Sequence, residues 1–340
     1  MKRIHLLLPY SLPPQEVAKD LQAQLKAPHF ATLLGLTRAK SSWQQSDYAR
    51  AHIHEYFLSG DLTSNTPAER AAISESRPSP ALAHTLMAQY GLAPQDGYWF
   101  LLQPVHLHVA LDHLVLTDSQ ELQLTSTEAQ AFFAMAETLC QEYGHVLLQG
   151  DDKQWFLRAD QWSGLNTASL NAACGHNIEI WMAEGEHARA WRKLQNEIQM
   201  EWFNSDLHRA REAAGKPSIN SLWLSHGADR INCQALNVQE LSSNAASFDF
   251  AISQTETLYI CKQLELAWLN QDWYQWLLKF AELDQRVFAV LTQALAKGQL
   301  QQLDLSLSRA NQMTQCQIKP KRWWQFGRQA TLTLLSQDLA

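Results

Sequence analysis

The chain has 340 residues, of which 46% are hydrophobic and 18% are charged, and its net charge is −7. This composition excludes a mainly disordered chain, and the acidic balance argues against a nucleic-acid binder, which needs clustered lysine and arginine. No apolar stretch approaches the roughly 20 residues of a membrane span, and the run at 4–8 is too short for a signal peptide. Five scattered cysteines without a Cys-x-x-Cys pair indicate neither a disulfide framework nor a zinc finger. A cytoplasmic globular protein fits these features.

The N-terminal part predicts a strand followed by helices. Residues 5–8 form a short apolar run that Pro9 ends, which is typical of a buried strand. A helix is expected to begin near Pro14, since proline fits the first turn of a helix. Residues 41–96 are expected to be mostly helical, with polar breaks between the helices.

From Tyr98 onward the pattern changes to strands around a helix. Short segments rich in β-branched and aromatic residues predict strands at 98–102, 105–110, 113–116, 145–148 and 154–158. Between them, Thr125 and Glu128 have the spacing of a capping box, and Gly144 ends the helix that this box begins. Together these elements predict a compact α+β subdomain inserted at residues 98–160.

The C-terminal half predicts further helices and buried strands. A long helix is expected at 186–214, with an apolar face formed by Leu194, Ile198, Phe203 and Leu207. Helices are also expected at 253–268 and 272–296, and strands at 219–224 and 301–307. In open α/β sheets, ligands bind outside the carboxyl ends of the strands. The polar segment 226–229, directly after a predicted strand, is therefore a candidate ligand site.

Three segments carry a family resemblance when they are taken in order. They are residues 103–107 (QPVHL) with 112–116 (DHLVL) and 127–129 (TEA), residues 194–200 (LQNEIQM), and residues 210–215 (AREAAG) running into 219–224 (INSLWL). In this order they resemble the bacterial RpfE-type regulatory proteins, which are often labelled phosphoglycerate mutase-like. The resemblance extends from about residue 95 to Trp324.

A more distant resemblance reaches the archaeal-type, cofactor-independent phosphoglycerate mutases of the alkaline phosphatase superfamily. Arg211, Gly215 and Asn220 keep the spacing of one segment of those enzymes, whereas Ser205, Asp206 and His208 depart from it. The resemblance implies an α/β fold in which residues 1–97 and 161–340 form a mutase-like core sheet. Residues 98–160 would then be the inserted α+β subdomain.

The same resemblance implies chemistry for which this chain lacks the expected residues. Mutases of this family use two metal ions held by Asp and His, and a Ser or Thr nucleophile. Their first Asp follows strand one in an Asp-Gly turn, whereas residues 9–12 here read Pro-Tyr-Ser-Leu. Asp-Gly-His metal motifs are not found in the C-terminal half, and Asp284 falls where the family has a helix. We therefore predict no catalytic residue, no metal site and no cofactor.

These observations favour a catalytically degenerate, mutase-like protein with a regulatory or ligand-binding role. Two alternatives stay open at this point. One is an active metal-dependent phosphoglycerate mutase or phosphohydrolase with rearranged ligands, and the other is a structural protein that binds partners through a tryptophan-rich surface. Resemblance of fold does not decide between them.

The candidate ligand-binding residues are Arg211, Asn220, His226, Asp229 and Asn196. Arg211 offers a cation for a small anionic metabolite, and His226 a group that can donate or accept a proton. The competing interpretation is an ordinary turn at His226 and Asp229, an arginine that complements a helix end at Arg211, and a solvated helix position at Asn196. A protein partner is also a candidate.

Two further groups of residues attract a functional interpretation. His106, His108 and His113 resemble a metal cluster, but no cysteine accompanies them, so cross-strand or surface histidines are the preferred interpretation. Four basic residues surround aromatic ones near the C-terminus: Lys319, Lys321, Arg322 and Arg328. A surface strand or tail is preferred there over a site for an anionic partner.

Overall fold

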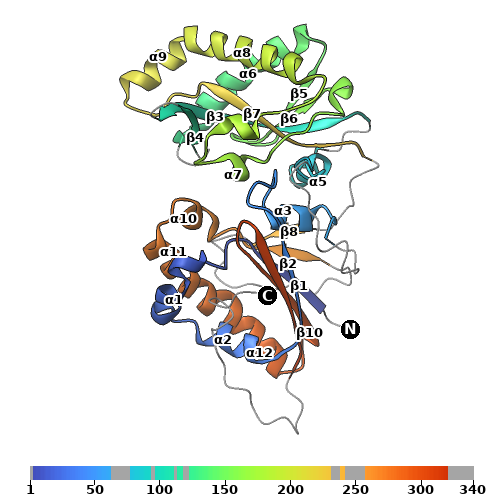
Figure 1. Ribbon diagram of the computed structural model, residues 1–340, viewed down its shortest axis with the longest axis vertical. Helices are drawn as coiled ribbons and strands as arrows, with labels where there is room; N and C mark the ends of the chain where they lie inside the picture. Colours follow the sequence, from blue (N-terminus) through green and yellow to red (C-terminus); the bar gives the residue numbers. More distant parts are fainter. Residues whose placement is uncertain are drawn as a thin grey trace. The chain divides into compact units, whose positions relative to one another are not determined.

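The computed structural model in Figure 1 describes residues 3–62, 77–92, 96–110, 113–117, 122–230, 238–241 and 257–320. The chain divides into two compact units. The first comprises Met1–Asp47, Asn65–Ala72 and Leu236–Ala340, and the second comprises Tyr48–Ser64 and Ile73–Ala235. The insertion predicted at 98–160 lies wholly within the second unit, which continues beyond it in both directions. Both units combine helices with a sheet, so the predicted α/β class is confirmed.

The first unit contains a six-stranded sheet with the order β2-β11-β10-β1-β9-β8. Its strands are β1 (Arg3–Leu8), β2 (Thr37–Gln44), β8 (Val238–Glu240), β9 (Leu258–Ile260), β10 (Gln302–Ser308) and β11 (Gln312–Ile318). Strand β1 pairs in parallel with β10 and β9, β8 pairs in parallel with β9, and β11 runs antiparallel to β10 and β2. Four neighbouring strands therefore end at one shared carboxyl edge.

Helices cover one face of this sheet (Figure 1). They are α1 (Gln15–Gln24), α2 (Pro28–Gly35), α10 (Glu265–Leu269), α11 (Trp273–Leu283), the π-helical turn η4 (Asp284–Phe288) and α12 (Ala289–Ala296). Alternate strand residues such as Leu6 and Leu305 pack against helical Phe30, Phe280 and Leu291 in one buried cluster. The predicted strands at 5–8 and 301–307 and the predicted helix at 272–296 are confirmed.

Two predictions for the first unit are wrong in part. The helix expected at 253–268 is replaced at Leu258–Ile260 by β9, and α10 begins only at Glu265. A three-residue strand buried between two parallel neighbours has no polar–apolar alternation, so its sequence pattern does not separate it from a buried helix. Residues 41–44 belong to β2, not to a helix.

The second unit is built on an antiparallel sheet in which β3 (Trp99–Ala110) pairs with three other strands. Its partners are β4 (His113–Thr117), β6 (Trp155–Arg158) and β7 (Ser221–Ala228), and β5 (Val146–Gln149) pairs with β6. Helices α6 (Ser126–Glu142), α8 (Ala188–Asn204) and α9 (Asp206–Ala213) accompany it, with shorter helices α3 (Ile53–Leu58), α5 (Ala83–Gln89), η2 (Asp160–Trp162), α7 (Leu170–Ala173) and η3 (Ile178–Trp181). The predicted segments 98–102 and 105–110 form one continuous strand, β3, and the other strands predicted here and the capping box of α6 are confirmed.

The long helix predicted at 186–214 is broken at Ser205. The Ser205 hydroxyl accepts a hydrogen bond from the His208 backbone N–H at 3.1 Å and so caps α9. Trp202, not Phe203, lies on the buried face of α8, with exposed fractions of 0% and 62% respectively. Among the described residues, no helix is both long and apolar enough to cross a membrane.

Candidate functional site

The carboxyl edge of the parallel strands in the first unit is where an open α/β sheet places its ligands. The loop after β1 lies at this edge and is densely packed. Tyr10 has a φ of 57° and is fully buried, and its carbonyl oxygen accepts the Trp276 indole N–H at 2.9 Å. The hydroxyl of Ser11, also buried, donates to the carbonyl oxygen of Leu8 at 2.7 Å. This loop therefore presents a buried aromatic ring and an internally bonded hydroxyl.

A nucleophile and a metal site each need groups that this loop does not supply. The Ser11 hydroxyl is bound to a backbone carbonyl and not to an imidazole or a carboxylate that could take its proton. Within the described ranges, no group of three or more His, Cys, Asp or Glu side chains is placed to hold a metal ion.

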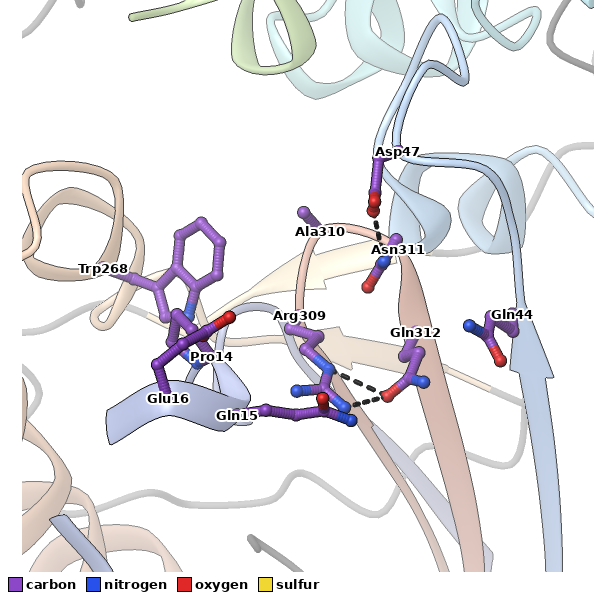
Figure 2. Close-up of a pocket in the computed structure, with 10 residues that line it drawn as sticks. All are labelled: Pro14, Gln15, Glu16, Gln44, Asp47, Trp268, Arg309, Ala310, Asn311 and Gln312. Atoms are coloured by element: carbon purple, nitrogen blue, oxygen red, sulfur yellow. Dashed lines mark hydrogen bonds between the residues drawn. The ribbon is translucent and has the colours of Figure 1, made fainter. Parts of the chain in front are cut away.

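A pocket of about 340 Å³ opens at the same edge (Figure 2). Ten residues line it, from the start of α1, the end of β2, α10 and the turn between β10 and β11: Pro14, Gln15, Glu16, Gln44, Asp47, Trp268, Arg309, Ala310, Asn311 and Gln312. All ten belong to the first unit. These segments are far apart in the chain, and the order of the strands in the sheet brings them together.

The Arg309 guanidinium is held in place at the pocket by the adjacent strand and loop. Its Nε donates to Gln312 Oε1 at 2.8 Å, and Nη2 also donates to this oxygen (Figure 2). Nη1 donates to the carbonyl oxygen of Pro13 at 3.3 Å. Gln312 is only 6% exposed, so the positive charge of Arg309 has a fixed position in the wall.

The other walls of the pocket are also fixed by hydrogen bonds. The Trp268 indole N–H donates to the Leu12 carbonyl oxygen at 3.1 Å, and its ring lies 5.0 Å from that of Tyr10. Across the pocket, the Asn311 side-chain amide donates to the Asp47 carboxylate (Figure 2). The pocket thus combines an indole ring, amides, two carboxylates and one guanidinium.

Among the predicted site residues, Arg211 is bound by protein atoms in the second unit. Its side chain is 1% exposed, and Nη1 lies 2.9 Å from Glu128 Oε2. Nε and Nη2 donate to the carbonyl oxygen of Pro217, and Nη2 also donates to that of Leu122. The pKa of Glu128 is lowered to about 2: burial opposes this shift, but hydrogen bonds from Thr125 and the charge of Arg211 outweigh it.

His226 is also bound within the second unit, near the other end of β7. Nε2 lies 3.3 Å from Glu55 Oε1, Nδ1 is 3.1 Å from the Pro80 carbonyl oxygen, and the backbone N–H donates to Ser79 Oγ at 2.9 Å. Arg211 and His226 share no partner. His226 lies five positions after Ser221, where β7 begins, which at about 3.3 Å per residue is roughly 16 Å along the strand.

Glu55 is the centre of this buried network. Its Oε2 accepts hydrogen bonds from Ser169 Oγ at 2.8 Å and from the His52 backbone N–H at 2.6 Å. Burial alone would raise the pKa of Glu55, but the hydrogen bond and charge of His226, with the nearby His54 and His52, lower it to about 2. The network ties α3 to β7.

The other three predicted residues have separate surroundings. Asn220 exchanges hydrogen bonds with the backbone of Leu107, at 2.8 Å in both directions, and extends the pairing of β7 with β3. Asn196 is exposed on α8, whereas its neighbour Gln195 is buried and donates to Ser221 Oγ and the Leu222 carbonyl oxygen. Sequence reasoning missed Gln195, which it could have found as a polar residue beside Leu194 on the apolar face.

Asp229 lines a different pocket, of about 550 Å³, in the second unit. Its other lining residues include Asp96, Tyr98, Asp160 and Arg230. The hydrogen bond from Arg158 lowers the pKa of Asp160. Because β7 belongs to an antiparallel sheet, the rule that places ligands at the carboxyl ends of parallel strands does not apply to Asp229.

The other residues that the sequence analysis considered as metal ligands contact neighbouring protein groups. The His106 and His108 rings are stacked at 5.7 Å, with Ser218 Oγ 3.1 Å from His106 Nδ1. Asp284 lies in η4, as predicted for a helix, and accepts the backbone N–H of Phe30 at 2.7 Å, so it caps α2. The basic C-terminal segment from Lys321 onward lies outside the described residues.

No known family model and no curated protein match the chain. Among solved structures, the cofactor-independent phosphoglycerate mutase from Thermoplasma acidophilum DSM 1728 is 9% identical, with a TM-score of 0.43 over 99% of this chain and 94% of that chain. The PH0037 protein from Pyrococcus horikoshii is 9% identical, with a TM-score of 0.49 over 94% of this chain and 88% of that chain. A likeness at this level concerns chain arrangement and assigns neither a reaction nor a ligand to this protein.

Proposed function

We propose that this chain is a catalytically degenerate, phosphoglycerate mutase-like protein that binds a small metabolite and acts in regulation, as its resemblance to RpfE-type proteins implies. One observation carries the proposal. At the end of β1, where the mutase family needs a metal-binding carboxylate, the chain has the buried ring of Tyr10 and the internally bonded hydroxyl of Ser11.

The packing of this loop supports binding without turnover. Tyr10 is fixed by Trp276 and by its left-handed backbone, and Leu12 is fixed by its N–H bond to the Ser308 carbonyl oxygen. A divalent metal pair would need several oxygen ligands in this place. Residues 9–12 of this loop include no carboxylate, and their internal hydrogen bonds hold the loop in place.

The pocket beside this loop supports a ligand-binding role. It lies at the carboxyl edge of the parallel strands, and its polar groups face a cavity. The sequence-based hypothesis that Arg211 and His226 take a small anion together stays a prediction. Their polar atoms are bound to Glu128, Glu55 and backbone carbonyls, which supports a structural role.

The direct test is an assay of the purified protein with 3-phosphoglycerate and added Mn²⁺ or Mg²⁺. We expect no mutase turnover, whereas turnover on the order of 1 s⁻¹ or more would sink the proposal. Ser11→Ala is the companion variant, because any turnover that survives in it does not use this hydroxyl. Stoichiometric Mn or Zn in the purified protein would favour the rival, an active enzyme with rearranged ligands.

A further inference from the structure

The pocket at the carboxyl edge of the first sheet has a lining that is mostly polar, with two carboxylates and one guanidinium. Seven of its ten residues carry amide, carboxylate or guanidinium groups. We propose that this pocket binds a neutral, polyhydroxylated ligand, namely a sugar of one or two rings. This inference rests on the proposed function, in which this edge of the sheet binds a metabolite without reacting with it.

The charges of the lining disfavour a phosphorylated ligand. Arg309 is the single cation among the ten residues, whereas two of them, Glu16 and Asp47, are carboxylates. A phosphate monoester carries a charge of about −1.5 to −2 at neutral pH, so it would add to an excess of negative charge. A neutral ligand avoids this repulsion, and in this respect the pocket differs from the anion site expected from the sequence.

The hydrogen-bonding groups of the lining match hydroxyls. Each hydroxyl both donates and accepts, whereas carboxylates only accept and amide nitrogens only donate. Gln312 uses its Oε1 for Arg309, and its Nε2 makes no hydrogen bond to any described residue. The side chain of Gln312 is 6% exposed and lines the pocket, so this donor has a fixed position within reach of a ligand. A ligand oxygen would satisfy it.

Other polar side chains lie beside the Gln312 Nε2 donor in the pocket wall. Gln44 is the register partner of Gln312 on the adjacent strand β2, so the two amides lie side by side. Asp47 and Glu16 supply acceptors for the hydroxyl protons of the same ligand. Alternating donors and acceptors of this kind suit the vicinal hydroxyls of a sugar.

Trp268 supplies the apolar part of the site. Its ring is partly buried, and its position is fixed by the bond to Leu12 and by the contact with Tyr10. A rigid aromatic ring buries the C–H face of a sugar with little loss of side-chain freedom. The cavity, about 340 Å³, lies at the small end of the roughly 300–1,000 Å³ range of ligand pockets, which fits one or two sugar rings.

The test is calorimetric titration with D-glucose, D-galactose and maltose, and with glucose 6-phosphate and 3-phosphoglycerate as charged comparators. We expect at least one neutral sugar to bind with a Kd of about 1 mM or tighter, and the comparators to bind about tenfold more weakly. Gln312→Glu keeps an acceptor for Arg309 but removes the Nε2 donor, so it should weaken sugar binding about tenfold, as should Trp268→Ala. Gln315→Glu, on the same strand but outside the lining, is the matched control and should bind as wild type does.

Several outcomes would overturn the inference. These are no heat with any of the three sugars, tighter binding of either phosphorylated comparator, or equal weakening by Gln315→Glu and Gln312→Glu. If Trp268→Ala does not fold, Gln312→Glu and its control still decide. The proposed function fails separately, through mutase turnover in an assay that contains no sugar, so the two failures can be told apart.

Discussion

His226 Nε2 lies 3.3 Å from Glu55 Oε1, and the opposite ring nitrogen lies 3.1 Å from the carbonyl oxygen of Pro80. The Glu55 carboxylate and the Pro80 carbonyl oxygen therefore hold the ring between α3 and the segment that precedes α5. The His226 backbone has a φ of 55°, an uncommon value for a residue with a side chain. The buried pair therefore holds β7 in this conformation and holds α3 to it.

Glu55→Gln should destabilise the second unit and change its response to acid. The native pKa of Glu55 is about 2 and its ordinary value is 4.5, so its stabilisation is present above pH 4.5 and is lost as pH falls toward 2. A difference of this size corresponds to about 3 kcal/mol. Urea unfolding between pH 7 and pH 2 should show a shallower acid loss in the variant. Glu184→Gln, the same change at an exposed carboxylate, should retain the wild-type slope.

His52→Gln should act at a higher pH. Burial is the main cause that lowers the native pKa of His52 to about 4, and the nearby Glu55 opposes the shift. The unfolded chain binds this proton near pH 6.5 and the native chain does not, so wild-type stability should fall as pH drops from about 6.5 to about 4. The variant should lose less stability over this interval in the same unfolding experiment. Equal losses in the variant and in wild type would show that His52 does not resist protonation.

The sequence predicted elements well where local patterns decide them. The capping box at Thr125 and Glu128 forms as expected, because cap and helix are adjacent in the chain. The break between α8 and α9 at Ser205 was not predicted. The amphipathic pattern continues across this serine, and the pattern does not indicate that the chain changes direction there. Phe203 was expected on the apolar face, but Trp202 is the buried residue, because it lies four positions after Ile198 on the same side of the helix.

The candidate site could not be predicted in this way. Its residues come from the start of α1, the end of β2, α10 and the turn after β10, and no spacing in the sequence connects Glu16 with Trp268 or Gln312. Only the order of the strands brings them to one edge. The lack of a carboxylate in the loop after β1 needed no such long-range information, since it depends on the types of residues 9–12 alone. The burial of Tyr10 and the hydrogen bond of Ser11 could be found only from the fold.

Arg211→Met should cost about 3–5 kcal/mol in the free energy of unfolding, because it removes a fully buried guanidinium that pairs with Glu128 and bonds two backbone carbonyl oxygens. Arg209→Met is the matched control two residues away. Arg209 is 60% exposed and its partner Asp206 is fully accessible, so losing this pair should cost about 1 kcal/mol or less. If both variants lose the same free energy of unfolding in chemical denaturation, Arg211 has no special structural role. The hypothesis that it binds an anion would then be favoured.

Trp223→Ala should cost about 3–5 kcal/mol, because the ring is buried on the face of β7 opposite to Leu222 and Leu224. Those two leucines pack toward α6 and α8, while Trp223 packs with Val105 and the α7 segment, so this strand is buried on both faces. The indole N–H also donates to the Ala168 carbonyl oxygen at 2.8 Å. Trp223→Phe keeps most of the packing and loses this bond, so it should cost about 1–3 kcal/mol, including the penalty for the unpaired carbonyl. The free energies of unfolding of both variants and of wild type are measured by denaturant unfolding under the same conditions. A melting temperature of Trp223→Ala within error of wild type would mean that the Trp223 ring does not contribute to a buried core on this face of β7.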